Sequence, residues 1–179
     1  FSNALDELVA RTQCTAYLAV LDKDDIVMLG CREGTLPVRF VWQVGDRLPA
    51  NTTAMGKAMM MHMSKKELDA HLGTRSQLRT LTDKSLTTRE ALERDLNIAR
   101  KRGWGSAREE IYPGLTAVGA AILDRHARPI ASISISYLDH PPQPKRMEKL
   151  AEIVQEVAKD VSRKVSSRGE YDGRKTTDL

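Results

Sequence analysis

Apolar residues recur along this chain with two different spacings, which separate the expected helices from the expected strands. A helical stripe at Leu5–Val9 is followed by two strand-like runs, Thr15–Leu21 and Ile26–Cys31, on either side of the polar turn Asp22–Asp25. This order predicts an amphipathic helix and then a β-hairpin. A third run, Val38–Val44, has strand composition, and its alternation predicts one face that carries Val38, Phe40, Trp42 and Val44.

The middle of the chain changes to helical spacing. Two helices are expected at roughly residues 53–63 and 65–72. The second has a capping box, Ser64-Lys-Lys-Glu67, and a natural stop at Gly73. A similar box, Thr87-Thr-Arg-Glu90, predicts a third helix that ends at Gly103.

The last third predicts three strands and a long amphipathic helix. The chain is therefore expected to be of the α+β class. From residue 166 the sequence is Ser, Gly and charge without apolar spacing, which predicts disorder. The expected strands are residues 105–111, Thr116–Leu123 and Ile130–Tyr137, and the expected helix is Met147–Val165.

Composition narrows the class only loosely. The 179 residues suit one domain with a real core, 41% of them are hydrophobic, and no run is long enough to span a membrane. No signal peptide is recognised, and Cys14 and Cys31 suit a reducing compartment, so a cytoplasmic location is expected. The net charge of +4 is a mild basic balance that favours solubility more than any one partner.

The segment Gly45–Met63 carries the first functional signal. A polar group, Asn51-Thr52-Thr53, precedes an apolar helical run, and small residues at Ala54 and Gly56 occupy its first turn. Helix starts leave amides without partners, so the N–H groups of roughly residues 53–57 are candidates to hold a small carboxylate. The alternative is an ordinary core helix whose first turn meets only water.

A second signal lies in the strand Ile130–Tyr137. Its alternation places Ile133 and Ile135 on one face and three serines on the other: Ser132, Ser134 and Ser136. A row of hydroxyls that faces a covered cleft suits a polar ligand. The same row facing water would carry no function.

These segments together resemble the effector-binding domain of the IclR family of bacterial transcription regulators. The block Leu48–Ala58 reads L-P-A-N-T-T-A-M-G-K-A, where typical members read L-P-x-H-A-T/S-A-x-G-K-A. Five motifs in the family's order, covering residues 3–166, are far more specific than one. The other four are Leu5–Thr12 with Tyr17–Asp22, Arg100–Trp104 with Glu109–Leu115, Ala120–Asp124 with Ser132–Ser136, and Met147–Val165.

The resemblance implies a GAF/profilin-like antiparallel sheet flanked by helices, with the effector-binding domain at residues 1–165 and a polar tail at 166–179. It implies a homo-oligomer, dimer or tetramer, that binds DNA only through an N-terminal winged helix-turn-helix absent from this chain, and no membrane. The implied ligand-binding residues, with Gly56 added by the helix-start argument, are Phe40, Leu48, Ala54, Met55, Gly56, Ala107, Ala117, Ser134 and Ser136.

Departures from the family pattern shape the expected effector. Ala107 and Arg108 stand where many members have two aspartates, so an acidic pocket residue is lost, and whether Arg108 faces the pocket is open. Asn51 replaces the usual His, while Phe40 and Met55 make the region bulky. These changes favour a small organic acid with an apolar or aromatic body over a hydroxylated one.

Other chemistries find little support. The four histidines lack metal-ligand spacing, neither cysteine joins a C-x-x-C motif, and Gly56-Lys57 lacks the spacing of a P-loop. We therefore expect no catalytic residue, no metal and no cofactor, and a sensor domain rather than an enzyme. Two alternatives remain open: a small-molecule enzyme of α+β fold, and a ligand-free dimerisation module.

Overall fold

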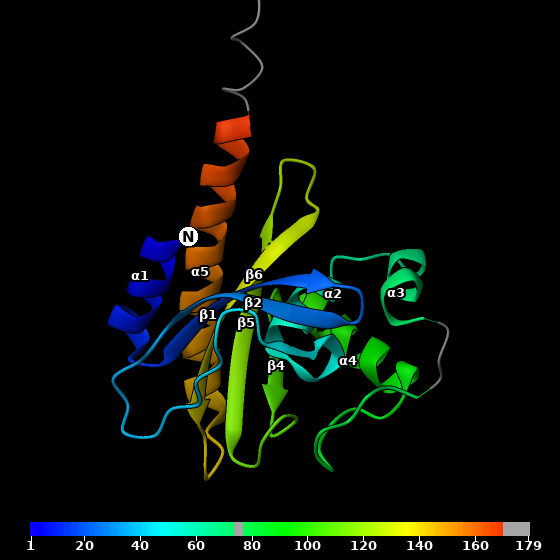
Figure 1. The fold of residues 1–179 in the computed structure, drawn as a ribbon, viewed down its shortest axis with the longest axis horizontal. Helices are drawn as coiled ribbons and strands as arrows, with labels where there is room; N and C mark the ends of the chain where they lie inside the picture. Colours follow the sequence, from blue (N-terminus) through cyan, green and yellow to red (C-terminus); the bar gives the residue numbers. More distant parts are fainter. Residues whose placement is uncertain (74–76, 170–179) are drawn as a thin grey trace, which may run out of the picture.

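Six strands form one antiparallel sheet in the part of the chain that the computed structural model describes, residues 1–73 and 77–169 (Figure 1). Their order across the sheet is β3-β2-β1-β6-β5-β4, so the first and last strands along the chain, β1 and β6, are neighbours in its centre. The α+β expectation is confirmed. The strands are β1 Thr15–Asp22, β2 Asp25–Arg32, β3 Arg47–Pro49, β4 Gly105–Arg108, β5 Leu115–Leu123 and β6 Pro129–Leu138.

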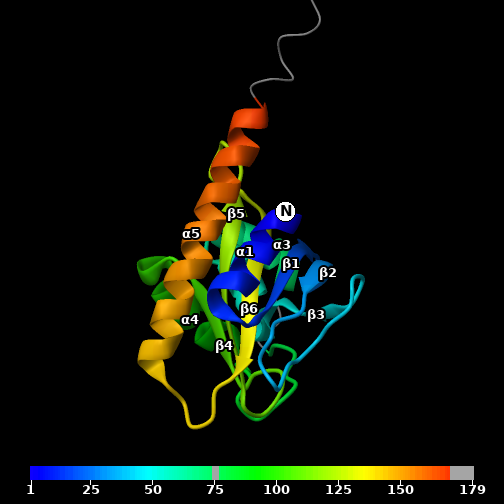
Figure 2. The same cartoon turned by 90° about the vertical axis from the view of Figure 1, so that its left-hand side faces the viewer.

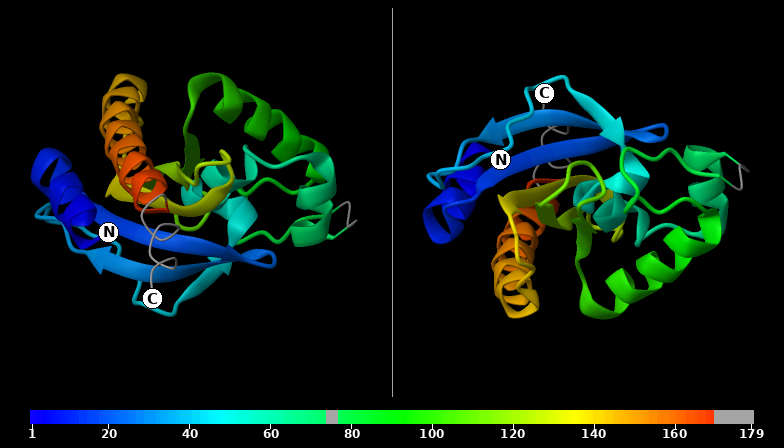
Figure 3. Two further views of the ribbon diagram at one scale, coloured as in Figure 1. Left: turned by 90° about the horizontal axis from the view of Figure 1, so that it is seen from above. Right: turned by 90° about the horizontal axis from the view of Figure 1, so that it is seen from below.

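Helices cover both sides of this sheet. The pair α1–α5 lies apart from the group α2, α3 and α4 (Figure 3), and α5 runs past the end of the sheet beside the N-terminus (Figure 2). The helices are α1 Ser2–Thr12, α2 Ala54–Met60, α3 Lys65–Leu72, α4 Arg89–Arg102 and α5 Pro144–Gly169, with a short 3₁₀ turn, η1, at Ala50–Thr52.

Strand alternation sorts the side chains into two cores. Ile133 and Ile135 of β6 are fully buried against α1 and α5, where they meet Leu8 and Val154. Burying such a side chain contributes about 1.5–3 kcal/mol. The serines between them point to the opposite face, where α2 covers the sheet. One alternation pattern therefore builds the core on one side and leaves hydroxyls on the other.

Helix α2 lies directly on the sheet because two strand glycines face it. A Cβ added at Gly105 would lie 2.6 Å from the Ala54 carbonyl oxygen, and one at Gly119 would lie 3.1 Å from the same atom. No larger residue fits at such distances without a shift of the helix backbone. The first turn of α2 is consequently held against β4 and β5.

The prediction of a strand at Val38–Val44 is wrong. Residues 39–43 have no strand structure, and the edge of β2 pairs instead with β3. Phe40 and Trp42 stack on each other with ring centroids 6.4 Å apart, while Val44 is 67% exposed. A contact between aromatic side chains, which the alternation does not reveal, decides the path of this segment.

Several other boundaries differ from the sequence expectation. Arg100 donates to the carbonyls of Met61 and Met63, and α2 ends before them. Strand β4 stops at Arg108 because Glu109 adopts a φ of 55°, which turns the chain. Thr88 rather than Thr87 caps α4.

The C-terminal helix is longer than expected. It continues to Gly169, so residues 166–169, which the sequence assigned to the tail, are helical. Propagating an existing helix costs little, even through residues of modest propensity. The rest of the expected tail, residues 170–179, lies outside the described residues.

Candidate functional site

A small cavity lies between the N-terminus of α2 and the strands β1, β5 and β6. Its volume is about 20 Å³. It gathers six of the nine residues expected to bind ligand: Leu48, Ala54, Met55, Ala117, Ser134 and Ser136. The remaining lining residues are Tyr17, Met28, Trp42, Thr53, Ile111 and Leu115.

Two residues in the first turn of α2, Ala54 and Met55, line this cavity. Thr53 caps the helix, and its Oγ1 accepts from the Gly56 amide at 2.9 Å. The Lys57 amide is also used, since it donates to the Thr53 carbonyl at 3.1 Å. Within the described residues no acceptor takes the amide of Ala54 or Met55. The expectation of open amides over residues 53–57 therefore narrows to these two.

Two serines of β6, Ser134 and Ser136, line the same cavity. Ser134 and Ser136 are 2% and 5% exposed and pair across the sheet with Gly119 and Ala117. Ser136 Oγ donates to the Tyr17 hydroxyl at 3.4 Å. Burial raises the pKa of Tyr17, so it remains a neutral hydroxyl and donates to the Phe40 carbonyl.

An aromatic cluster covers the cavity, and we call it the lid: Phe40, Trp42 and Tyr112. The Trp42 ring meets Tyr17 edge-on at 5.6 Å, and Phe40 lies 5.8 Å from Tyr112. Such aromatic pairs contribute about 0.5–1.5 kcal/mol beyond their buried area. Of the three lid residues, Trp42 lines the cavity.

A tight corner joins α1, β1 and the segment that leads to the lid. Gln13 adopts a left-handed φ of 62° at the end of α1, and its carbonyl accepts from the amides of Thr35 and Leu36. Thr15 Oγ1 accepts from the Gly34 amide at 3.2 Å. The start of the lid segment is therefore fixed to the corner where α1 becomes β1.

The cavity as it stands has room for about one water molecule. Met55, Trp42 and Leu48 are large apolar side chains in its lining. A ligand of even a few carbon atoms therefore has to displace part of the lid.

Three of the expected ligand residues do not line the cavity. Phe40 lies in the lid above it, and Gly56 packs against the backbone of Ala50. Ala107 is buried next to Ala117 on the same face of the sheet. The orientation of Arg108 is settled, since its Nε lies 3.3 Å from Met147 Sδ on the opposite face.

A buried ionic network lies just behind the cavity. Lys57 is 1% exposed, and its Nζ lies 2.6 Å from Glu110 Oε1 and 3.0 Å from Asp95 Oδ2. Burial raises the pKa of Glu110, and the charge of Lys57 opposes this rise. The network connects α2 and α4 to the residue next to Ile111, which forms a wall of the cavity.

Sequence reasoning missed Trp42, Tyr17 and this network. Trp42 and Tyr17 each lie in an apolar run where nothing distinguishes them from core residues. Lys57 did carry a signal, because a single lysine inside an apolar helix requires a buried acid as its partner.

Two classes of site find no support in residues 1–73 and 77–169. No cluster of three or more His, Cys, Asp or Glu side chains has a geometry that would hold a metal ion. No helix among these residues is long and apolar enough to cross a membrane.

Comparison with known proteins decides the family. Residues 1–163 match the family model described as the bacterial transcriptional regulator IclR C-terminal domain. The chain belongs to the IclR family. Among IclR-family relatives, XynR of Escherichia coli, an HTH-type transcriptional regulator, is 34% identical over 134 residues, which cover 75% of this chain and 53% of XynR. KdgR of the same species is 31% identical over 131 residues, covering 73% and 49%.

Solved structures agree. The IclR protein of Thermotoga maritima superimposes with a TM-score of 0.85 at 29% identity, covering 92% of this chain and 66% of that one. The C-terminal domain of E. coli KdgR gives a TM-score of 0.81 at 26% identity, covering 92% and 94%. This chain spans about half the length of the regulators XynR and KdgR. The IclR-family relatives are transcriptional regulators and not enzymes, as expected.

Proposed function

We propose that this domain senses a small organic acid for a DNA-binding transcriptional regulator. One observation carries the proposal: Ala54 and Met55, whose amides have no acceptor among the described residues, line the same small cavity as the hydroxyl-bearing Ser134 and Ser136. The amides of Ala54 and Met55 come from a helix start, which favours an anion, and Ser134 and Ser136 supply hydrogen-bond donors from the facing strand.

The supporting chemistry favours an acid with an apolar or aromatic body. Charge-assisted bonds from the two amides would each contribute about 1.5–3 kcal/mol net. Leu48, Met55 and Trp42 would cover the rest of the ligand. No side chain of the lining carries a charge, so the helix start is the chief attraction for the anion.

The proposed mechanism is a shift between two arrangements of the site. The ligand binds the form with the lid displaced and so raises its population. In the full-length protein, within the bacterial cytoplasm, this shift resets the arrangement of an oligomer and the spacing of its DNA-binding modules. Family membership supports this mechanism, because the relatives XynR and KdgR are HTH-type regulators.

A ligand-free dimerisation module is the second candidate. The cavity volume of about 20 Å³ favours it, because a site that never opens would bind nothing. The two functions differ in one measurable property. A sensor gains stability with a suitable acid, whereas a pure dimerisation module does not.

The test is a thermal-shift screen of small carboxylates, including benzoate, followed by titration of the best one. Ala54→Asp should abolish binding, because its carboxylate competes for the same amides. Ser134→Ala should weaken binding about tenfold, the equivalent of one lost hydrogen bond. Ser132→Ala is the matched control, since Ser132 lies on the same strand outside the cavity. Equal affinities for Ala54→Asp and the parent, both folded, would rule out this site.

A further inference from the structure

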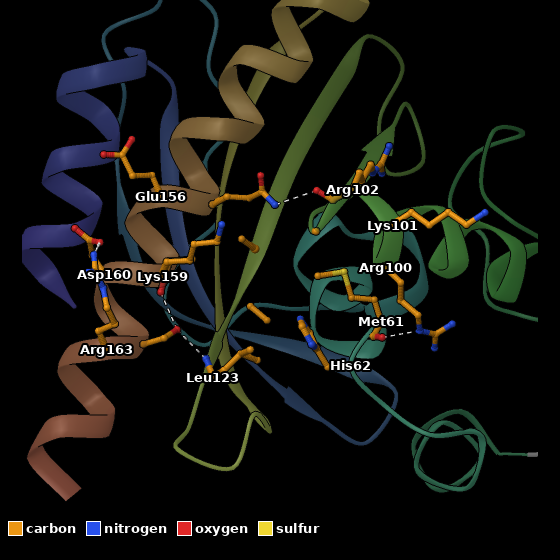
Figure 4. A pocket seen from close by; sticks show the side chains of 16 residues that line it. Met61, His62, Arg100, Lys101, Arg102, Leu123, Glu156, Lys159, Asp160 and Arg163 are labelled. Carbon is orange, nitrogen blue, oxygen red and sulfur yellow. Dashed lines mark hydrogen bonds and ion pairs between the residues drawn. The ribbon is translucent and has the colours of Figure 1, made fainter. Parts of the chain in front are cut away.

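A second hollow, much larger than the cavity, opens on the other side of α2. It is a groove of about 950 Å³ between α5 and the C-terminal end of α4, with β5 as its floor (Figure 4). A hydrogen bond from Gln155 Nε2 to the Arg102 carbonyl, 3.0 Å long, connects the two walls. The proposed sensor cavity and this groove share no residue.

The floor of the groove is an open strand edge. Strand β4 pairs with β5 only as far as Gly119, so among the described residues no strand pairs with the following residues on that side. Consecutive strand residues point to opposite faces, so a hollow lined by both Ala120 and Ala121 contains the edge itself. The amide of Leu123, held by Ser162 Oγ at 2.9 Å, closes the far end.

The side chains around this edge leave room for a strand. Ala120 and Ala121 are small, and the helices α4 and α5 stand apart on either side of β5 (Figure 4). A strand that pairs with an edge places alternate side chains on the two faces of the sheet. Residues of both faces line the groove, since Ala120 lies on the face of Ile133 and Ala121 on the face of Ser132.

The groove is electropositive. Both of its acids are already paired, Glu156 with Arg11 and Asp160 with Arg163. Four of its cations have no described acid within ion-pair distance, and Lys159 points across the groove toward β5 (Figure 4). These cations are Arg100, Lys101, Arg102 and Lys159.

This charge pattern selects the partner. An isologous contact between two copies would bring the same cations face to face, which disfavours a second copy of this chain. The lining contains no Phe, Tyr or Trp on which bases could stack, which disfavours a single-stranded nucleic acid. An acidic peptide in extended conformation satisfies both the cations and the open backbone groups.

We propose that the groove binds an extended, acidic segment of a partner protein, which pairs with β5 at Ala120–Ile122 as an added strand. The groove would then be a protein-interaction surface on a face remote from the proposed ligand site. Occupancy of one site does not require occupancy of the other.

The test uses this chain and a fluorescent octapeptide of alternating glutamate and valine, with anisotropy as the readout. Binding should weaken as the NaCl concentration is raised. A control octapeptide of alternating lysine and valine should not bind. Lys159→Glu should weaken binding about tenfold. Lys149→Glu, the same change at an exposed position of α5 outside the groove, should not.

Backbone pairing is tested separately. Two further peptides carry N-methyl groups on all valines or on all glutamates, and at least one should bind about tenfold more weakly because one peptide edge cannot donate. Hydrogen exchange should slow within Ala120–Ile122 on peptide binding.

Several results would overturn the proposal. They are no salt-sensitive binding of the acidic peptide, equal binding by Lys159→Glu, indifference to both methylation patterns, or protection elsewhere in the chain. Tighter binding of a single-stranded oligonucleotide would assign the groove to nucleic acid. A change of oligomeric mass in Lys159→Glu would assign it to a contact between copies.

Discussion

At the scale of single residues, Lys57 is a charged side chain that is almost completely buried. Its ammonium group is removed from water and depends on Glu110 and Asp95 for compensation. Desolvating a charge without a partner costs several kcal/mol, so each member of the network depends on the others.

Lys57→Met should lower the free energy of unfolding by about 3–5 kcal/mol, because it leaves the buried carboxylate of Glu110 and the partly buried one of Asp95 without their cation. Urea unfolding measures the change. The double variant Lys57→Met with Glu110→Gln should lose less than the sum of its single changes. Lys65→Met, at an exposed position, serves as control and should change stability by less than about 0.5 kcal/mol. Strict additivity of the two changes would show that the pair is not coupled.

Residue identity also shows how far the candidate site could be predicted. Strand alternation places Ser132, Ser134 and Ser136 on one face, and the family resemblance selects the last two. Ala54 follows from the same resemblance and from the rule that helix starts leave amides free. The loss of the Gly56 amide to Thr53 depends on which of three polar residues becomes the cap, which the sequence Asn51-Thr52-Thr53 does not decide. Tyr17 and Trp42 join the site only through contacts between distant segments.

At the scale of elements, local patterns predicted the helices and hairpins well, because caps and alternation act within a few residues. The prediction of a strand at Val38–Val44 failed because the conformation of this segment depends on contacts with the Tyr17 hydroxyl and with Tyr112, which are far away in the chain. The position of α2 against the sheet likewise depends on glycines in β4 and β5. These are packing contacts between elements, which the spacing of apolar residues in the sequence does not reveal.

The seat of α2 leads to a prediction of its own. In Gly119→Ala the new Cβ would lie 3.1–3.2 Å from backbone atoms of Ala54 and Met55, so the helix must shift. We expect a loss of about 1–3 kcal/mol in the free energy of unfolding. The control is Gly30→Ala, where the nearest atom, at 3.2 Å, belongs to the flexible side chain of Leu5. Equal losses in the two variants would contradict a rigid seat for α2.

At the scale of the whole molecule, the prediction concerns assembly. The proposed function requires that at least two copies act together, since a regulator that reads two half-sites needs paired DNA-binding modules. Light scattering of this chain should give at least twice the monomer mass of 20.0 kDa at high micromolar concentration. A mass of one subunit across the whole concentration range would be incompatible with assembly through this domain.

The corner at Gln13 has a mechanical consequence for such an assembly. It leaves only two residues, Gln13 and Cys14, between α1 and β1, and its backbone bonds to Thr35 and Leu36 attach the lid segment to the same point. Because this connection is short and hydrogen-bonded to the lid segment, a movement of that segment should be transmitted to α1. If the ligand displaces the lid as proposed, we expect α1 to rotate about this corner. Because Ser2 lies at the far end of the helix, the rotation would move it farther than residues near the corner.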